Sequence, residues 1–247
     1  VSNNFVAADQ LEDTPTDSAD DGIGNFCTFN PNDFRGGGSG SLSNGNRTVT
    51  SSATYFAAGG TIAITGSDKI HLEFTIGTWS TSTYFGFMNA TAVSNYTGGP
   101  QQVSNEGLGI NNNTTTLETR FSDIGVVSAS PNVTWADGDR ITIELDKSTG
   151  DMYVWKNGAA INGGASMTTG AGKTFLANAV ALVPYSANYN AYNQTMNSGQ
   201  TPFVDTPTAG YVALATQNLP APTIADGSQY FNTFGLRVEA TLLHIHW

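Results

Sequence analysis

The strongest constraint on the fold is a β-hairpin pattern in residues 137–158, DGDRITIELDKSTGDMYVWKNG. Ile141, Ile143 and Leu145 alternate with polar residues, and a side-chain period of two places these apolar side chains on one face of a strand. The sequence DKSTG then predicts a turn, because Asp bonds to its own backbone and Gly adopts positive φ. The chain returns as MYVW and turns again at NG. These residues predict two paired antiparallel strands with Ile143 in the core.

The composition extends this prediction to the whole chain. Its 247 residues include 28 Gly, and only 12% are charged, which is typical of short strands joined by turns. Bulky core residues are present as 13 Phe, 9 Tyr and 4 Trp. We therefore expect an all-β protein with almost no helix, whose strands form two packed sheets of jelly-roll type. Further strands are predicted at residues 47–54, 61–65, 69–76, 84–90, 107–110, 116–121 and 174–183. In residues 69–76 the inward side chains are those of Ile70, Leu72, Phe74 and Ile76.

The charge and the cysteine content exclude several classes of function. A formal net charge of −11, with only 9 Lys and Arg, argues against nucleic acid as a partner. Cys27 is the single cysteine, so an intrachain disulfide is excluded and a small buried apolar role is expected. No apolar run approaches the length of a membrane span, and residues 1–10 lack the basic start and apolar core of a signal peptide. We expect no membrane insertion.

The candidate catalytic and metal-binding groups are few. Glu144 and Asp146 form a Glu-x-Asp pair on a predicted strand, and glycoside hydrolysis uses two carboxylates. The third acid that such sandwich enzymes place after this pair is missing, and Asp146 can serve as a turn former, which favours a structural role. His71 stands alone, while His244 and His246 lie two residues apart on a predicted edge strand without a third ligand. We therefore predict no enzymatic activity, no metal site and no cofactor.

The hairpin and its neighbours resemble a known family. Residues 137–158, with 69–76 (KIHLEFTI) and 84–90 (YFGFMNA), resemble the central strands of SPRY (B30.2-like) domains. Further pieces resemble SPRY-like structural proteins of bacteriophages, of the marine tail-fibre or virion type: residues 3–17, 24–33, 42–46, 197–203 and 213–233. The resemblance implies a concanavalin-like, SPRY-like jelly-roll β-sandwich. It also implies a non-enzymatic virion component, such as a tail fibre, spike or capsid decoration. Residues 234–247 depart from it.

The chain divides into three predicted parts. Residues 1–24 form an extended acidic N-terminal segment, residues 25–205 the sandwich, and residues 206–247 a linker and a terminal strand. Neither flank has enough bulky residues for a core of its own. The apolar side chains of Tyr211 and Leu214, with the intervening valine, would be exposed on a monomer. We expect other subunits to cover the flanks in a homo-oligomer, which the resemblance to phage fibres suggests is a trimer.

Surface recognition is the remaining function. Loops rich in Asn, Ser, Gly and Tyr are predicted at residues 92–99 and 187–197, a composition that adaptable binding surfaces favour. The candidate contacts to a host-surface glycan or protein are Trp79, Tyr96, Tyr189 and Tyr192. The alternatives are that these residues belong to solvated turns or subunit contacts, and that Trp79 is a loop anchor or part of the core. The alternative function is a carbohydrate-binding or glycan-degrading lectin-like module of a bacterial surface or secreted protein.

Overall fold

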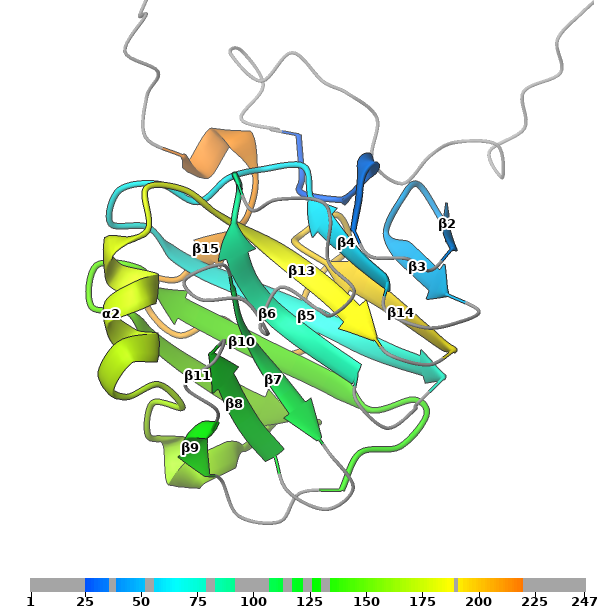
Figure 1. Ribbon diagram of the computed structural model, residues 1–247. Coiled ribbons are helices and arrows are strands. Elements are labelled where there is room, and N and C mark those ends of the chain that lie inside the picture. The colour runs from blue at the N-terminus through cyan, green and yellow to red at the C-terminus, as the bar shows by residue number, and fades with distance from the viewer. Residues whose placement is uncertain are drawn as a thin grey trace, which may run out of the picture.

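The computed structural model describes residues 25–35, 39–51, 56–78, 83–91, 107–112, 117–121, 126–129, 134–188 and 191–219. These residues form two mainly antiparallel sheets packed face to face, and only β15 pairs in parallel among the described strands. Figure 1 shows β6, β7 and β13 in the nearer layer and β5 and β10 in the farther one. One α-helix, α2, lies at the side of the sandwich. The predicted all-β sandwich is confirmed.

The first sheet has seven strands in the order β1-β4-β13-β6-β7-β8-β9. Their bounds are β1 Phe29–Arg35, β4 Phe56–Gly60, β6 Thr83–Asn89, β7 Gly107–Asn112, β8 Leu117–Phe121, β9 Val126–Ala129 and β13 Leu182–Asn188. Each pair of neighbours in this sheet is antiparallel. The strands predicted at residues 84–90, 107–110 and 116–121 are present.

The second sheet has eight strands, in the order β12-β11-β10-β5-β14-β3-β2 with β15 paired to β5. Their bounds are β2 Gly40–Ser43, β3 Thr48–Ser51, β5 Lys69–Thr78, β10 Arg140–Asp146, β11 Asp151–Lys156, β12 Ala159–Ala160, β14 Tyr192–Asn197 and β15 Val212–Ala213. The predicted hairpin is β10 paired with β11. Asn157 and Gly158 both have positive φ, at 49° and 82°, as a tight two-residue turn between β11 and β12 requires.

The core lies between the two sheets. All side chains predicted to point inward from β5 and β10 are fully buried: Ile70, Leu72, Phe74, Ile76, Ile141, Ile143 and Leu145. Rings connect the layers, because Phe85 of β6 stacks on Phe74 at 5.4 Å and on Trp135 at 4.6 Å between centroids. Cys27 is buried in the same core, as predicted. Each buried side chain of this size contributes roughly 1.5–3 kcal/mol to folding.

Three sequence predictions are wrong in detail. Residues 174–183 do not form one strand, because the helix α2 spans Gly170–Asn178 and β13 begins at Leu182. A short apolar run fits a buried helix as well as a buried strand, and here Phe175 and Leu176 pack on the sandwich from the helix. Residues 61–65 are not a strand, although Ile64 forms an isolated bridge. The described residues of 187–197 are mostly strand and not loop, because β13 ends at Asn188 and β14 spans Tyr192–Asn197.

The described part of the C-terminal flank packs on its own domain. Leu214 is fully buried in the core, and its carbonyl accepts a hydrogen bond of 2.9 Å from the Cys27 amide. β15 extends the second sheet beside β5, and the short 3-10 helix Thr216–Asn218 follows. Another 3-10 helix, Ile161–Gly164, follows β12. The prediction that another subunit covers Leu214 is therefore wrong. Residues 1–24 and 220–247, which include His244 and His246, lie outside the described residues.

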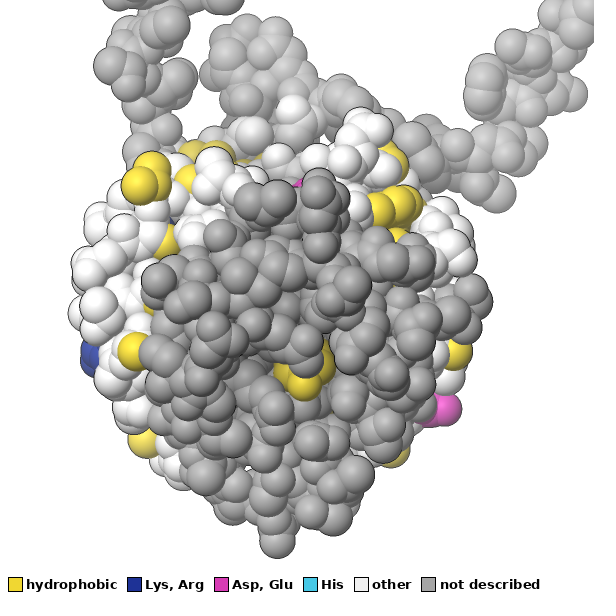
Figure 2. Space-filling model, viewed as in Figure 1, with side chains coloured by type: hydrophobic (Ala, Val, Ile, Leu, Met, Phe, Trp, Pro, Cys, Tyr) yellow, Lys and Arg dark blue, Asp and Glu magenta, His cyan; other side chains and the backbone are white. Residues whose placement is uncertain are grey.

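Where the described residues are visible in Figure 2, their hydrophobic side chains appear as separate spots. The exposed large hydrophobic residues of the described chain are Phe34, Val180, Val204 and Val212. Single exposed apolar residues are normal on a soluble surface. Within the described ranges, no helix has the length and hydropathy needed to cross a membrane.

Candidate functional site

The polar face of the hairpin forms an ordered array on the outer side of the second sheet. The strand register places Glu144 opposite His71 on β5 and opposite Tyr153 on β11. Thr142 lies likewise between Glu73 and Trp155. The alternation that turns the isoleucines of β10 inward turns these side chains outward. A polar outer face is normally solvated, yet His71, Glu73, Thr142 and Glu144 are only 1–3% exposed. Another part of the chain must therefore cover them.

The cover is residues 198–213, which we call the covering segment. The amides of Val204 and Asp205 both donate to Oε1 of Glu73, at 2.8 Å each. The Thr208 amide donates to Oε1 of Glu144 at 2.7 Å. Carboxylate acceptors make stronger hydrogen bonds than neutral ones. Two buried carboxylates of the sheet therefore hold the backbone of the covering segment.

Asp205 also anchors the covering segment, and here the carboxylate belongs to the segment while the donors belong to the sheet. Nη2 of Arg140 donates to Oδ1 of Asp205 at 2.6 Å, and Nε of Arg140 donates to Oδ2 at 3.3 Å. The hydroxyl of Thr142 also donates to Oδ2. Burial alone raises the pKa of Asp205, but the hydrogen bonds from Arg140 and Thr142 outweigh it, so the pKa lies below its ordinary value. Asp205 therefore stays ionised near neutral pH.

Glu144 and His71 form a buried pair under the segment. Nδ1 of His71 lies 2.9 Å from Oε1 of Glu144, and the ring of Phe203 packs edge-on against the imidazole at 4.5 Å. Burial raises the pKa of Glu144, but the bonds from His71 and from the amide and hydroxyl of Thr208 outweigh it and lower the pKa. Nε2 of His71 is buried and has no hydrogen-bond partner among the described residues. In the sequence His71 stands alone. In the structure, the register of β5 with β10 places it beside Glu144.

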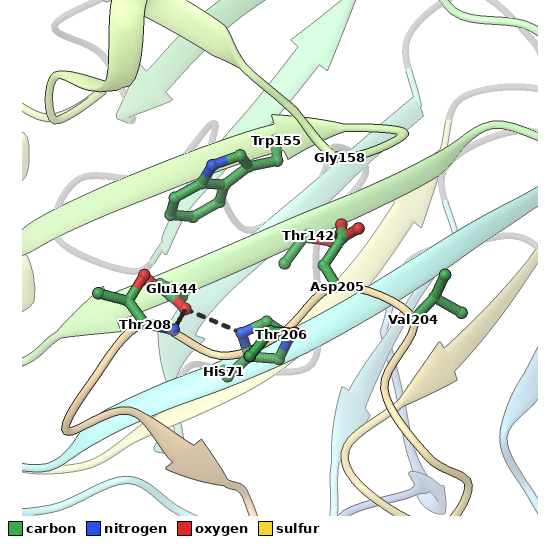
Figure 3. Close-up of a pocket in the computed structure, with 9 residues that line it drawn as sticks. All are labelled: His71, Thr142, Glu144, Trp155, Gly158, Val204, Asp205, Thr206 and Thr208. Carbon is green, nitrogen blue, oxygen red and sulfur yellow. Dashed lines mark hydrogen bonds and ion pairs between the residues drawn. The ribbon is translucent and has the colours of Figure 1, made fainter.

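A cavity of about 250 Å³ lies between the outer face and the covering segment. Its lining residues are His71, Thr142, Glu144, Trp155, Gly158, Val204, Asp205, Thr206 and Thr208. Figure 3 shows the Trp155 ring on one side of this space, with Thr206, Thr208 and Asp205 of the covering segment across from it. The cavity thus combines one aromatic surface, several hydroxyls and two fixed carboxylates.

Only one of the predicted contact residues, Tyr192, lies in the described part of the chain, and it does not line this cavity. Trp79, Tyr96 and Tyr189 lie outside the described residues. Tyr192 is only 1% exposed, and its hydroxyl lies 3.4 Å from that of Ser186 inside the sandwich. Burial raises the pKa of the Tyr192 hydroxyl. The prediction of a surface contact at Tyr192 is wrong, because the residue begins the strand β14 and its alternation turns it inward with Met196.

Asp146 has the turn-forming role that the sequence predicted. Its Oδ1 accepts hydrogen bonds from the amide of Ser148 at 3.0 Å and from the Ser148 hydroxyl at 2.5 Å. Its Oδ2 pairs with Lys69 at 2.8 Å. The pairing of Glu144 with His71 comes from the register of β10 with the distant strand β5, which the hairpin pattern does not specify, and no periodic signal marked Asp205 or Thr208. No group of three potential metal ligands occurs within the described ranges.

Comparisons with known proteins address the fold. No protein-family model matches the sequence, and no curated protein matches it. The SPRY domain of human HERC1 is similar in structure, with a TM-score of 0.52 and 15% identity over 70% of this chain and 99% of that domain. The PSpry domain of TRIM65 gives a TM-score of 0.53 and 12% identity over 70% of this chain and 89% of that one. At such identities the likeness concerns the fold alone. The fold of this chain is therefore a SPRY-like β-sandwich.

Proposed function

We propose that this protein is a non-enzymatic structural component of a bacteriophage particle, in a tail fibre, spike or capsid decoration. In this role the sandwich serves subunit assembly and recognition of the host surface. The observation that carries the non-enzymatic part is the structural use of three buried or half-buried carboxylates, two of which line the cavity. Glu73, Glu144 and Asp205 each accept hydrogen bonds that hold the covering segment in place. They act as structural anchors.

The ionisation of two of these carboxylates supports a binding role over glycoside hydrolysis. Glu144 and Asp205 line one cavity, and hydrolysis of a glycosidic bond also needs two carboxyl groups around one site. One of the two must remain protonated near neutral pH, which requires a raised pKa. The hydrogen bonds from His71 and Arg140 keep the pKa of both carboxyls low. Neither group is therefore suited to act as the general acid.

The particle assignment is supported by the sequence resemblance to phage structural proteins and by the composition. An acidic chain with one cysteine and 28 Gly suits an extracellular β-rich assembly. The test is mass spectrometry of purified phage particles, together with immunogold electron microscopy. We expect the protein at a fixed copy number and at one place on the particle. Its recovery only from the soluble fraction of infected cells would contradict the proposal.

The absence of catalysis is tested separately, with a panel of bacterial and marine polysaccharides. We expect neither the wild-type chain nor Glu144→Gln to release reducing ends. Hydrolysis by the wild-type chain that is abolished by Glu144→Gln would overturn the non-enzymatic part of the proposal.

We extend the proposal to a homo-oligomer, with a trimer as the expected state. The support is that residues 1–24 and 220–247 have too few bulky residues to form a core alone. Light scattering should give a trimer for the full chain and a monomer for a chain truncated after Leu219. A monomeric full chain would contradict this extension.

A second candidate function is a carbohydrate-binding module of a bacterial surface or secreted protein. The observation that favours it is Trp155 beside a polar cavity, since an aromatic ring with nearby hydroxyls and carboxylates suits a sugar. The particle analysis separates the two candidates. A cell-wall or culture-medium location without particles would favour the second.

A further inference from the structure

We propose that the cavity under the covering segment binds one uncharged sugar ring of a glycan, with Trp155 as its stacking surface. This inference rests on the proposed role in host-surface recognition, and it names the site and the ligand class. The loop residues Trp79, Tyr96 and Tyr189 stay separate predictions.

The aromatic side of the site is provided by β11. Trp155 is half-buried and faces the cavity, and the Tyr153 ring follows on the same face of the strand, 6.5 Å away between centroids and tilted by 41°. A pyranose ring has an apolar face of C–H groups and a rim of hydroxyls. The apolar face packs on an aromatic ring, while the rim requires hydrogen-bonding groups. Trp155 offers the first of these surfaces.

The polar side of the site is provided by the covering segment and by β10. The hydroxyl of Thr206 lines the cavity and has no hydrogen-bond partner within the described part of the chain. Asp205 accepts three hydrogen bonds from Arg140 and Thr142. An ionised carboxylate has about four acceptor positions, so Asp205 retains one for a sugar hydroxyl. The ion pair fixes the carboxylate in place before any ligand arrives, which reduces the entropic cost of binding.

A buried polar atom also points to a ligand with hydroxyl groups. His71 lines the cavity and is 1% exposed, and its Nε2 has no partner in the described chain. When Nδ1–H donates to Glu144, the neutral imidazole presents an acceptor at Nε2. Buried polar atoms are nearly always hydrogen-bonded in native proteins. A hydroxyl donor in the cavity would satisfy this atom, directly or through a water molecule.

The charge of the site determines which sugars it accepts. Glu73, Glu144 and Asp205 are opposed by one guanidinium, that of Arg140, so the surroundings of the cavity are negative when His71 is neutral. The whole chain carries a net charge of −11. Acidic sugars would place a further negative charge beside these carboxylates. The site is therefore specific for uncharged sugars.

The size of the cavity limits the ligand to a single ring. Its volume of about 250 Å³ lies below the range of roughly 300–1,000 Å³ for drug-sized ligands. A site of this size binds one sugar weakly, with a dissociation constant of about 1 mM or more. Several copies in an oligomer would convert weak sites into strong attachment to a glycan-coated surface.

The experiment is an NMR titration of the full chain with glucose, galactose, mannose and N-acetylglucosamine. Glucuronic acid and N-acetylneuraminic acid are the charged comparisons. At least one uncharged sugar should shift the Trp155 indole N–H signal and the amides of Thr206 and Thr208. The acidic sugars should leave all three unchanged. No response to any uncharged sugar at about 50 mM, or an equal response to the acidic ones, would overturn the inference.

Three variants make the test specific to this cavity. Trp155→Ala should weaken binding of the responding sugar about tenfold or more, whereas Trp155→Phe should retain it within about threefold. Val180→Ala changes an exposed residue outside the cavity and should not affect binding. Equal affinity of Trp155→Ala and the wild-type chain would overturn the inference.

Failure of this inference differs from failure of the proposed function. If the protein is found in particles but no sugar shifts the Trp155 signal, the site assignment is wrong and the particle role stands. If a sugar binds at Trp155 but particles lack the protein, the particle role is wrong and the site stands.

Discussion

The two faces of β5 and β10 are both buried, but by different means. On the inner face, Ile70, Leu72 and Ile143 pack against the opposite sheet and are fully excluded from solvent. On the outer face, Glu73 and Glu144 are almost as buried, beneath a segment with little regular secondary structure. The first face is stabilised by the burial of apolar area. The second depends on hydrogen bonds from backbone amides to carboxylates.

This difference shows that a polar strand face can be covered when each buried polar group has a partner. Apolar packing tolerates small changes of shape, whereas a buried carboxylate that loses its partner is costly. A polar group introduced into the inner face should therefore lower the free energy of unfolding. On the outer face, the loss of individual hydrogen bonds should lower it. Substitutions on each face separate these two modes.

The largest effect is expected on the inner face, for Ile143→Asp. The new carboxylate would be buried between the sheets without a partner, and we expect destabilisation of more than about 4 kcal/mol. Urea unfolding followed by circular dichroism measures this change. The matched control, Ile143→Val, should cost about 0.5–1.5 kcal/mol. Soluble Ile143→Asp protein that unfolds cooperatively near the wild-type midpoint would show that the face is assigned wrongly.

The next effect concerns the outer face and Glu73. Glu73→Ala removes the acceptor of the Val204 and Asp205 amides, so we expect a loss of about 1–3 kcal/mol and faster proteolysis within residues 198–213. Glu73→Gln keeps an acceptor oxygen and should lose less. Equal proteolysis of Glu73→Ala and the wild-type chain would mean that Glu73 does not hold the covering segment.

A smaller effect is expected from acidification. Asp205 and Glu144 have lower pKa values in the folded protein than the ordinary values of about 3.9 and 4.3 in the unfolded chain. Their contribution to stability is complete above the unfolded pKa values and is lost as the pH falls toward the folded ones. The contribution of these two carboxyls to the urea midpoint should therefore be constant from pH 5 to 7. Below about pH 4.5 the midpoint should decline. The urea midpoint of Asp205→Asn should decline less steeply with falling pH than that of the wild-type chain. An identical slope for the two chains would contradict the lowered pKa of Asp205.

The smallest effect is expected for Lys69→Ala. Lys69 pairs with Asp146 at 2.8 Å on the same sheet face, but its side chain is 44% exposed. Exposed ion pairs are screened by solvent and contribute little. We expect a change in the urea midpoint close to the error of measurement. A change as large as that of Glu73→Ala would remove the distinction between covered and uncovered parts of the outer face.

Much of the inner face could be predicted from the sequence. The alternation of Ile141, Ile143 and Leu145 with polar residues specified one buried face, and the turn residues specified the hairpin register. The same alternation showed that Thr142 and Glu144 share the other face. It carried no information on whether that face is solvated, because a single strand does not reveal what lies above it.

The covering segment could not be predicted, for a physical reason. Its anchors are the backbone amides of Val204, Asp205 and Thr208, and nearly every residue type has a backbone amide. The segment also lacks the periodicity that marks a strand or a helix. Tyr192 was misplaced for a related reason, since a tyrosine in an Asn-rich stretch resembles a loop contact until its strand partners are known. Three of the four predicted contact residues remain untested predictions.

The most direct test of the anchored covering segment is hydrogen–deuterium exchange of individual amides in the full chain. The amides of Val204, Asp205 and Thr208, which donate to Glu73 and Glu144, should be strongly protected. The Thr206 amide has no acceptor within the described chain and is the internal control, with much faster exchange expected. Exchange of all four amides at the rate of an unstructured peptide would contradict the anchored segment and the cavity beneath it.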